Sequence, residues 1–190
     1  MTNKIIINSL KKIENIFENY SVKYLLMNGN VEKVLKSFLG MCFENLDENY
    51  SYVMDKRVAN HEIDMLAFNN GKELMAIEFK CTLSTDYSSS KFSSKKASEQ
   101  IKTTLKIKEL DKCKKYIIHF FNKSNPISNS SLNPKYIKDK YPLKSMSKEK
   151  LIEVYEENLK EFPIDISTYE YRFSNKDLGL DVLIIEIKDY

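Results

Sequence analysis

The sequence feature that most constrains the fold is the dipeptide Asn70-Gly71, which separates two apolar runs. Asn-Gly is the residue pair that most favours the tight turn of a β-hairpin, because both residues readily adopt positive backbone φ angles. The sequence therefore predicts two antiparallel strands, His61–Phe68 and Glu73–Cys81, joined by this turn.

Charged residues interrupt both predicted strands: Asp64 in the first, and Glu78 and Lys80 near the end of the second. Isolated buried charges cost much free energy, so these groups should be paired or bound to a metal ion. If the hairpin loop comprises residues 70–72, Asp64 lies directly opposite Glu78. The same register gives two further pairs, Leu66 with Ala76 and Phe68 with Leu74. A two-residue loop would put the carboxylates on opposite faces, so their pairing requires an odd-length loop or a β-bulge.

The opposed carboxylates of Asp64 and Glu78, with Cβ atoms about 4.5–5.5 Å apart, would repel each other unless a cation lay between them. Lys80 shares their face, because side chains alternate along a strand. Such hard oxygen ligands suit Mg²⁺ or Mn²⁺, which can lower the pKa of a bound water and polarise a phosphoryl oxygen. A neighbouring lysine can position the water or stabilise developing negative charge. The alternative is a surface hairpin with a Glu–Lys ion pair.

A strong amphipathic helix is predicted from Val31 to Phe43, because apolar residues recur at positions i, i+3, i+4 and i+7. With about 100° per residue, Glu32 falls inside the apolar stripe, whereas Glu44 falls on the polar face. We therefore expect Glu32 to support the carboxylate pair. The alternative is an acid favoured at the helix N-terminus by the helix dipole.

The remaining segments predict an α/β fold with a central mixed β-sheet flanked by helices. Further helices are expected at residues 4–27, Lys95–Leu110 and 147–161, the last with Ser147 as its N-cap. Further strands are expected at 50–58, Lys115–Phe121, 164–173 and 180–188. The serine-rich residues 83–94 predict a mobile loop, and the polar residues 122–146 predict a long irregular connection. We assign residues 1–190 to one domain, with an N-terminal helical extension (1–28), a core (29–121) and a C-terminal extension (122–190).

Lysine is concentrated in two segments of a chain whose formal net charge is only +3. Nine lysines lie from Lys91 to Lys115, against three acidic residues, and a second basic stretch runs from Lys135 to Lys150. Such local density can neutralise phosphates. An ordinary solvated surface is the equally weighted alternative.

Other patterns exclude several classes of protein. No run of about 18 apolar residues is present, so no membrane span is expected, and we interpret the N-terminus as mature protein rather than a signal peptide. Cys42, Cys81 and Cys113 are widely spaced, odd in number and without CxxC spacing, so neither a disulfide framework nor a zinc ribbon is indicated and a reducing cytoplasm is the default expectation. The phosphate-binding sequence GxxxxGK[ST] is absent, so a nucleotide-driven motor is not expected. His61 begins a hairpin strand near the expected metal, but it and His119 are more readily explained as structural.

These charged positions resemble those of the PD-(D/E)XK nuclease superfamily, which has the restriction-endonuclease-like fold. Asp64 matches the family's aspartate, and Glu78-Phe79-Lys80 matches its following motif, although Ile63 stands where the nominal motif has proline. In this family the metal is held by the aspartate, the glutamate and the carbonyl group after it. The resemblance therefore implies a metal site made of Asp64, Glu78 and the backbone of Phe79, with Lys80 beside it.

Neighbouring segments extend the resemblance to about residues 29–121. Glu32, just after Gly29, is similar to a helical glutamate found in many members. Residues 96–101 and the strand after them resemble the helix and strand that follow the lysine motif. Gln100 is a weaker match, because the role of this glutamine varies within the family and a surface glutamine is equally expected.

The resemblance implies an endonuclease that hydrolyses phosphodiester bonds in nucleic acid, with DNA favoured. One or two Mg²⁺ ions, with Mn²⁺ as a substitute, would assist attack by water, and the implied catalytic residues are Glu32, Asp64, Glu78, Lys80 and Gln100. The expected contacts to the nucleic-acid backbone are Lys91, Lys95, Lys96 and Lys102. Restriction or defence, junction resolution and repair are the settings considered, and an RNA substrate and a homodimer stay open. The alternative is a non-catalytic nucleic-acid-binding or assembly module that retains the nuclease fold.

Overall fold

The structure is a computed structural model that describes residues 2–19, 31–82, 87–122, 147–172 and 179–188. Its helices are α1 (Thr2–Asn19), α3 (Val31–Glu44), α4 (Tyr87–Thr104) and α5 (Lys148–Asn158), with a 3-10 turn at Lys108–Leu110. Its strands are β1 (Tyr50–Val58), β2 (His61–Asn69), β3 (Lys72–Thr82), β4 (Lys114–Asn122), β5 (Ile164–Arg172) and β6 (Gly179–Ile187). No helix in these ranges is long and apolar enough to cross a membrane.

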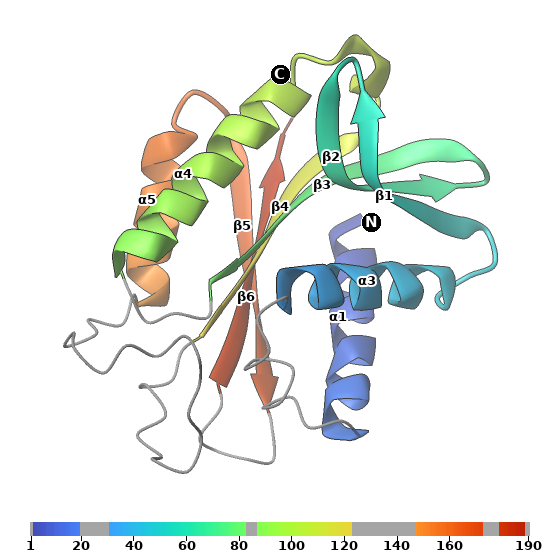
Figure 1. Ribbon diagram of the computed structural model, residues 1–190, viewed down its shortest axis with the longest axis horizontal. Helices are drawn as coiled ribbons and strands as arrows, with labels where there is room; N and C mark the ends of the chain where they lie inside the picture. Colours follow the sequence, from blue (N-terminus) through green and yellow to red (C-terminus); the bar gives the residue numbers. More distant parts are fainter. Residues whose placement is uncertain (1, 20–30, 83–86, 123–146, 173–178, 189–190) are drawn as a thin grey trace.

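The six strands form one mixed sheet in the order β1-β2-β3-β4-β6-β5. Only β3 and β4 run parallel among the described pairs, and α4 connects them across one face. Helices α1 and α3 lie on one side of the central strands, and α4 and α5 lie on the other (Figure 1). The predicted α/β class, with a mixed sheet flanked by helices, is confirmed at this level.

Two hydrophobic cores fill the space between the sheet and its four described helices, and a third, small cluster that includes Ile63 and Leu110 packs around the 3-10 turn. The larger core joins α1 and α3 to the sheet and includes Leu10, Leu39 and Phe79. The smaller core joins α4 and α5 to the opposite face and includes Ile101 and Leu183. Because side chains alternate along β3, Phe79 enters the first core, whereas its neighbours Glu78 and Lys80 project toward α4.

The Asn70-Gly71 turn has two residues, so the predicted three-residue loop is wrong. Both residues have positive φ, 51° and 72°, as a type I′ turn requires. A β-bulge between Ala67 and Phe68 then shifts the register by one residue. The bulge was one of the two conditions for opposing the carboxylates, and it corrects for the even-length loop.

Beyond the bulge, the strands keep the predicted register toward the site. Leu66 pairs with Ala76, as predicted, whereas Phe68 pairs with Glu73 rather than Leu74. The bulge therefore changes the pairing only between itself and the turn.

The prediction of a loop over residues 83–94 is wrong where the structure describes it, because α4 begins at Tyr87. Residues 83–86 lie outside the described residues. Serine has only moderate helix propensity, but Ser94, Ala97, Ser98 and Ile101 are buried at helical spacing. Small side chains on this face let α4 pack closely on the sheet, and this tertiary packing outweighs the local composition. The helix also ends earlier than predicted, at Thr104 rather than Leu110.

Most other predicted elements are found close to their expected bounds. Of the helix expected at residues 4–27, α1 covers the part up to Asn19, and residues 20–27 lie outside the described residues. The helix from Val31, the hairpin strands, the strand at Lys115–Phe121 and the last two strands are confirmed. Ser147 caps α5, because its side chain accepts a hydrogen bond from the Lys150 backbone N–H. The predicted irregular connection lies outside the described residues from 123 to 146. Cys42 and Cys113 are buried free thiols, and Cys81 is half-buried.

Candidate active site

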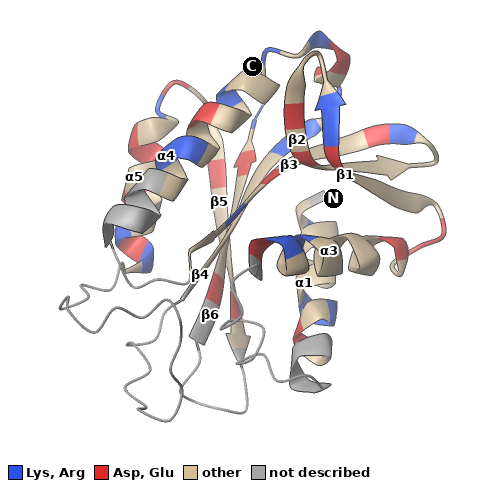
Figure 2. Ribbon diagram, viewed as in Figure 1, with Lys and Arg blue, Asp and Glu red and all other residues tan. Residues whose placement is uncertain are grey.

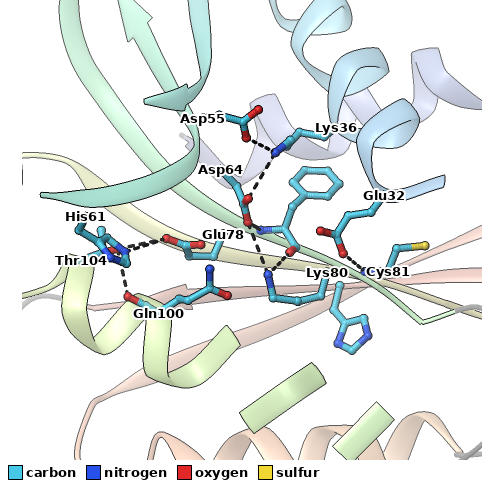
Figure 3. Close-up of polar contacts among 12 residues, drawn as sticks. Glu32, Lys36, Asp55, His61, Asp64, Glu78, Lys80, Cys81, Gln100 and Thr104 are labelled. Carbon is cyan, nitrogen blue, oxygen red and sulfur yellow. Dashed lines mark hydrogen bonds and ion pairs between the residues drawn. The ribbon is translucent and has the colours of Figure 1, made fainter. Parts of the chain in front are cut away.

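The candidate site lies where β2 separates from β3. The described pairing between these strands ends at Met65 and Ile77. Beyond that point, the Phe79 N–H donates to Asp64 Oδ2 at 2.7 Å, and the Cys81 N–H donates to Glu32 Oε2 at 2.9 Å (Figure 3). Two carboxylates therefore take the place of a neighbouring strand along this edge of β3.

Asp64 is the ionised carboxylate of the site. Its side chain is 16% exposed, and Oδ1 accepts from Lys36 Nζ at 3.3 Å while Oδ2 lies 3.6 Å from Lys80 Nζ. Burial would raise the pKa of Asp64, but Lys80, the Phe79 N–H and Lys36 together hold this pKa below its ordinary value. Asp64 thus carries negative charge at neutral pH.

Glu78 is fully buried and only partly satisfied. Its Oε1 accepts a 3.2 Å hydrogen bond from Thr104 Oγ1 and lies 3.6 Å from His61 Nε2. Its Oε2 has no hydrogen-bond donor, and neither His61 Nε2 nor Gln100 Oε1 has a hydrogen-bond partner. Burial, reinforced by the Asp64 carboxylate, raises the pKa of Glu78 to about 8. A buried carboxylate oxygen without a donor is costly, so Oε2 is suited to receive a cation.

Lys80 supplies a positive charge on the same strand as Glu78 and 3.6 Å from Asp64. Its Nζ donates to the Phe79 carbonyl oxygen at 2.6 Å and is nearly buried. The N–H and C=O of one strand residue point the same way, so the Phe79 carbonyl group faces the same open edge as the Asp64 carboxylate.

Glu32 reaches the site from the first turn of α3. Burial raises the pKa of Glu32, and Lys80 opposes that shift. The position of α3 depends on Gly40, because a Cβ there would clash with the ring of Tyr52 on β1. The absence of a side chain at Gly40 lets α3 approach the hairpin closely enough for Glu32 to cap the Cys81 N–H.

Three residues of the site were missed by sequence reasoning: Lys36, Asp55 and Thr104. Lys36 Nζ contacts both Asp55 Oδ1 and Asp64 Oδ1. Its signal was readable, because position 36 falls at about 140° on the α3 wheel, next to the apolar stripe. Asp55 and Thr104 carried no comparable signal, since each reaches its partner only through the tertiary fold.

The remaining predicted residues occupy α4. Gln100 is half-buried on the side of α4 that faces Glu78 (Figure 3). Lys95 and Lys96 are exposed, and α4 carries basic segments along its length (Figure 2). Lys102 Nζ lies 3.8 Å from Glu161 and 5.9 Å from the Phe162 ring centroid, so it is engaged within the fold. The side chain of Lys91 lies outside what the structure describes.

His119 belongs to a separate polar cluster and is structural, as expected. It is fully buried, and its Nε2 and Nδ1 each share a 2.8 Å hydrogen bond, with Thr82 Oγ1 and the Tyr155 hydroxyl respectively. Burial, reinforced by Lys80, lowers the pKa of His119 to about 3, so the ring is neutral. A neutral imidazole donates through one nitrogen and accepts through the other, which satisfies both contacts.

Comparison with known proteins identifies no relative whose site could be compared with this one. No family model matches the sequence, and neither the curated proteins nor the solved structures give a significant match. Across the described ranges, no three His, Cys, Asp or Glu side chains form a group that could hold a metal ion. A divalent ion here would need the Phe79 carbonyl oxygen in addition to Asp64 and Glu78.

Proposed function

We propose that this protein is a divalent-metal-dependent nuclease with a restriction-endonuclease-like fold, which hydrolyses phosphodiester bonds in nucleic acid and prefers DNA. The observation that carries the proposal is the convergence of Asp64, Glu78, Lys80 and the Phe79 carbonyl group at the open edge of β3. These groups come from adjacent strands and match the residue types that the sequence pattern predicts.

The donor set fits Mg²⁺ or Mn²⁺, because these ions prefer carboxylate and carbonyl oxygens. Asp64, Glu78 and the Phe79 carbonyl oxygen would hold the ion, and the donor-free Glu78 Oε2 supports this assignment. When bound, such an ion supplies an activated water and a polarised phosphoryl oxygen. In this structure the Phe79 carbonyl oxygen accepts a hydrogen bond from Lys80 Nζ. When the ion binds, Lys80 would release this oxygen and turn toward the substrate.

Each remaining side chain has a role that follows from its position. Lys80 would stabilise the negative charge that develops on the phosphoryl oxygens, since it is a nearly buried ammonium group beside the carboxylates. Glu32, held on the Cys81 N–H, would orient water at the other end of the open edge. Gln100 has an unpartnered side-chain oxygen that could accept a hydrogen bond from that water or from substrate.

The exposed lysines of α4 support a polyanionic substrate. Lys96 lies one turn before Gln100 on the same side of the helix, and Lys95 is also exposed. Lysines on the helix that also carries Gln100 and Thr104 can contact backbone phosphates on either side of the scissile bond.

The proposal is tested by incubating the purified protein with supercoiled plasmid, linear duplex, branched DNA and RNA, each with Mg²⁺ or with EDTA. We expect Mg²⁺-dependent cleavage of DNA that is lost in Glu78→Gln, a variant that preserves the shape of the buried side chain. Binding to DNA without cleavage of any substrate would instead support the non-catalytic module. Cleavage that persists in EDTA would overturn the metal-dependent mechanism.

A further inference from the structure

Lys36 occupies a position between two aspartates beside the candidate site. It projects from α3, is only 6% exposed, and its Nζ donates to Asp55 Oδ1 at 2.5 Å and to Asp64 Oδ1 at 3.3 Å (Figure 3). Met54 pairs with Met65 on one side of these aspartates, and Lys56 pairs with Ile63 on the other. The strand register is the same for both pairs, so Asp55 lies opposite Asp64 on the adjacent strand. The Lys36 ammonium group contacts both carboxylates.

Asp55 holds an unusual backbone conformation for a strand residue. Its φ is +52°, in the left-handed region that non-glycine residues seldom adopt. The regular pairs on both sides confine this departure to a single residue. Local strain of this kind persists where the surrounding structure imposes it, and it often accompanies functional groups. Here it accompanies the carboxylate that shares Lys36 with Asp64.

The contacts of Asp64 leave little room for several cations. An ionised carboxylate offers about four acceptor positions. Two of them are filled by hydrogen bonds, from Lys36 to Oδ1 and from the Phe79 N–H to Oδ2, and Lys80 Nζ lies 3.6 Å from Oδ2 as an ion-pair partner. An aspartate that bridges two metal ions gives one oxygen to each, and Lys36 already lies on Oδ1.

The net charge of the site also favours a single bound metal ion. The described carboxylates are Glu32, Asp55, Asp64 and Glu78, and the described ammonium groups among them are Lys36 and Lys80. When all are ionised, their formal charge is −2, which one divalent cation balances. A second divalent ion would leave the site with a net formal charge of +2, next to the Lys36 ammonium group.

We propose that the Lys36 ammonium group takes the place of a second metal ion, so that the site binds a single divalent cation. This inference rests on the proposed function and fixes how many metal ions take part in it. Lys36 acts through Asp64 and is therefore a positioning residue. Burial lowers the pKa of Lys36, but the contacts with Asp55 and Asp64 raise this pKa by more, so that it lies above its ordinary value. The group therefore stays charged at neutral pH.

The test is the stoichiometry of Mn²⁺ binding, measured by titration calorimetry and by electron paramagnetic resonance without nucleic acid. We expect one Mn²⁺ per wild-type chain and two per chain in Lys36→Met, which keeps most of the alkyl packing but removes the charge. The double variant Lys36→Met/Asp55→Asn should return to one ion, because asparagine tolerates the left-handed conformation but cannot supply a second charged ligand. Lys33→Met, an exposed lysine on the same helix, is the matched control and should bind one ion.

The wild-type measurement keeps the test decisive even if a variant does not fold. Two tightly bound ions in the wild type, with Mg²⁺-dependent cleavage, would overturn this inference and leave the proposed function standing. One ion in both the wild type and a folded Lys36→Met variant would also overturn it. No bound ion in the wild type would remove the metal site itself and both proposals with it.

Discussion

Two buried polar clusters each include a residue of β3, one around Glu78 and one around His119 on the neighbouring β4, and they differ in how fully their groups are satisfied. In the His119 cluster, both ring nitrogens are hydrogen bonded and the neutral state is fixed by burial. In the candidate site, Glu78 Oε2 and His61 Nε2 are buried without hydrogen-bond partners. Most buried polar groups in native proteins are satisfied, so the first cluster is what a structural role requires and the second calls for a ligand.

The difference follows from the two edges of β3. Toward β4, the parallel pairing is continuous from Met75 to Thr82. Toward β2, the pairing stops at Ile77, and side-chain carboxylates reach the free N–H groups. A closed ladder leaves no position for a ligand, whereas an interrupted one leaves a carbonyl group without a strand partner and concentrates charge. The same strand thus combines a rigid support with the edge that forms the candidate site.

The largest effect should come from removing the charge of Asp64. Asp64→Asn keeps an oxygen that can accept from the Phe79 N–H, yet it loses the ionised ligand. We expect cleavage to become undetectable and Mn²⁺ affinity to fall by more than about 100-fold, the upper range for residues that only support a metal ligand. Calorimetry and a plasmid assay measure both, and near-wild-type Mn²⁺ affinity would reject the ligand set.

Removing the Lys80 charge should separate catalysis from binding. In Lys80→Met we expect turnover to fall by about 10²–10³-fold, the usual loss for one group that stabilises transition-state charge. Mn²⁺ and DNA affinity should be retained, because the role is confined to the transition state. Lys115→Met, a buried lysine on β4, is the matched control and should leave turnover unchanged. Activity of Lys80→Met within a few-fold of the wild type would reduce Lys80 to an ion-pair partner.

Mn²⁺ binding to the candidate site should also depend on pH. Because the pKa of Glu78 is raised to about 8, most of this side chain is protonated at pH 6, and a metal ion must displace that proton. Mn²⁺ affinity should therefore rise by about tenfold per pH unit from pH 6 and level off above about pH 8. Glu78→Gln should remove this dependence, and a flat profile in the wild type would contradict the assignment.

A change in the His119 cluster should affect the stability of the fold and leave Mn²⁺ binding unchanged. Tyr155→Phe leaves His119 Nδ1 buried without its partner, which should lower the free energy of unfolding by about 1–3 kcal/mol. Mn²⁺ affinity should not change, because neither residue contacts the carboxylates. Urea denaturation and calorimetry test the two halves of this expectation. A loss of Mn²⁺ binding would mean that the two clusters are coupled and would weaken the comparison between them.

The smallest effect should come from the exposed lysines of α4, Lys95 and Lys96. Lys95→Ala/Lys96→Ala should weaken duplex DNA binding for all sequences alike. It should also flatten the slope of log affinity against log salt concentration by roughly 0.9 for each phosphate group that these lysines no longer neutralise. Lys4→Ala/Lys11→Ala, a pair of exposed lysines on α1 at the opposite face, is the control. Equal slopes for the two double variants would make α4 an ordinary solvated surface.

Much of the site could be predicted from the sequence because its central residues are close in the chain. Asp64 and Glu78 are joined by one turn, and the alternation along β3 gives Lys80 the same face as Glu78. Glu32 could be placed by helical periodicity alone. The missed residues depend on contacts across longer separations: Thr104 lies 26 residues from Glu78, and Lys36 lies 28 residues from Asp64.

The sequence by itself determined the hairpin, the amphipathic helix from Val31 and the residue types at the open edge, because local backbone preference and hydrophobic periodicity decide these features. Only the tertiary structure decided where the β-bulge lies, where α4 begins and which groups remain unsatisfied. The bulge and the start of α4 each balance a local preference against packing with a distant segment. Whether a buried polar atom finds a partner depends on every element around it, and for Glu78 those elements are β2, β3 and α4.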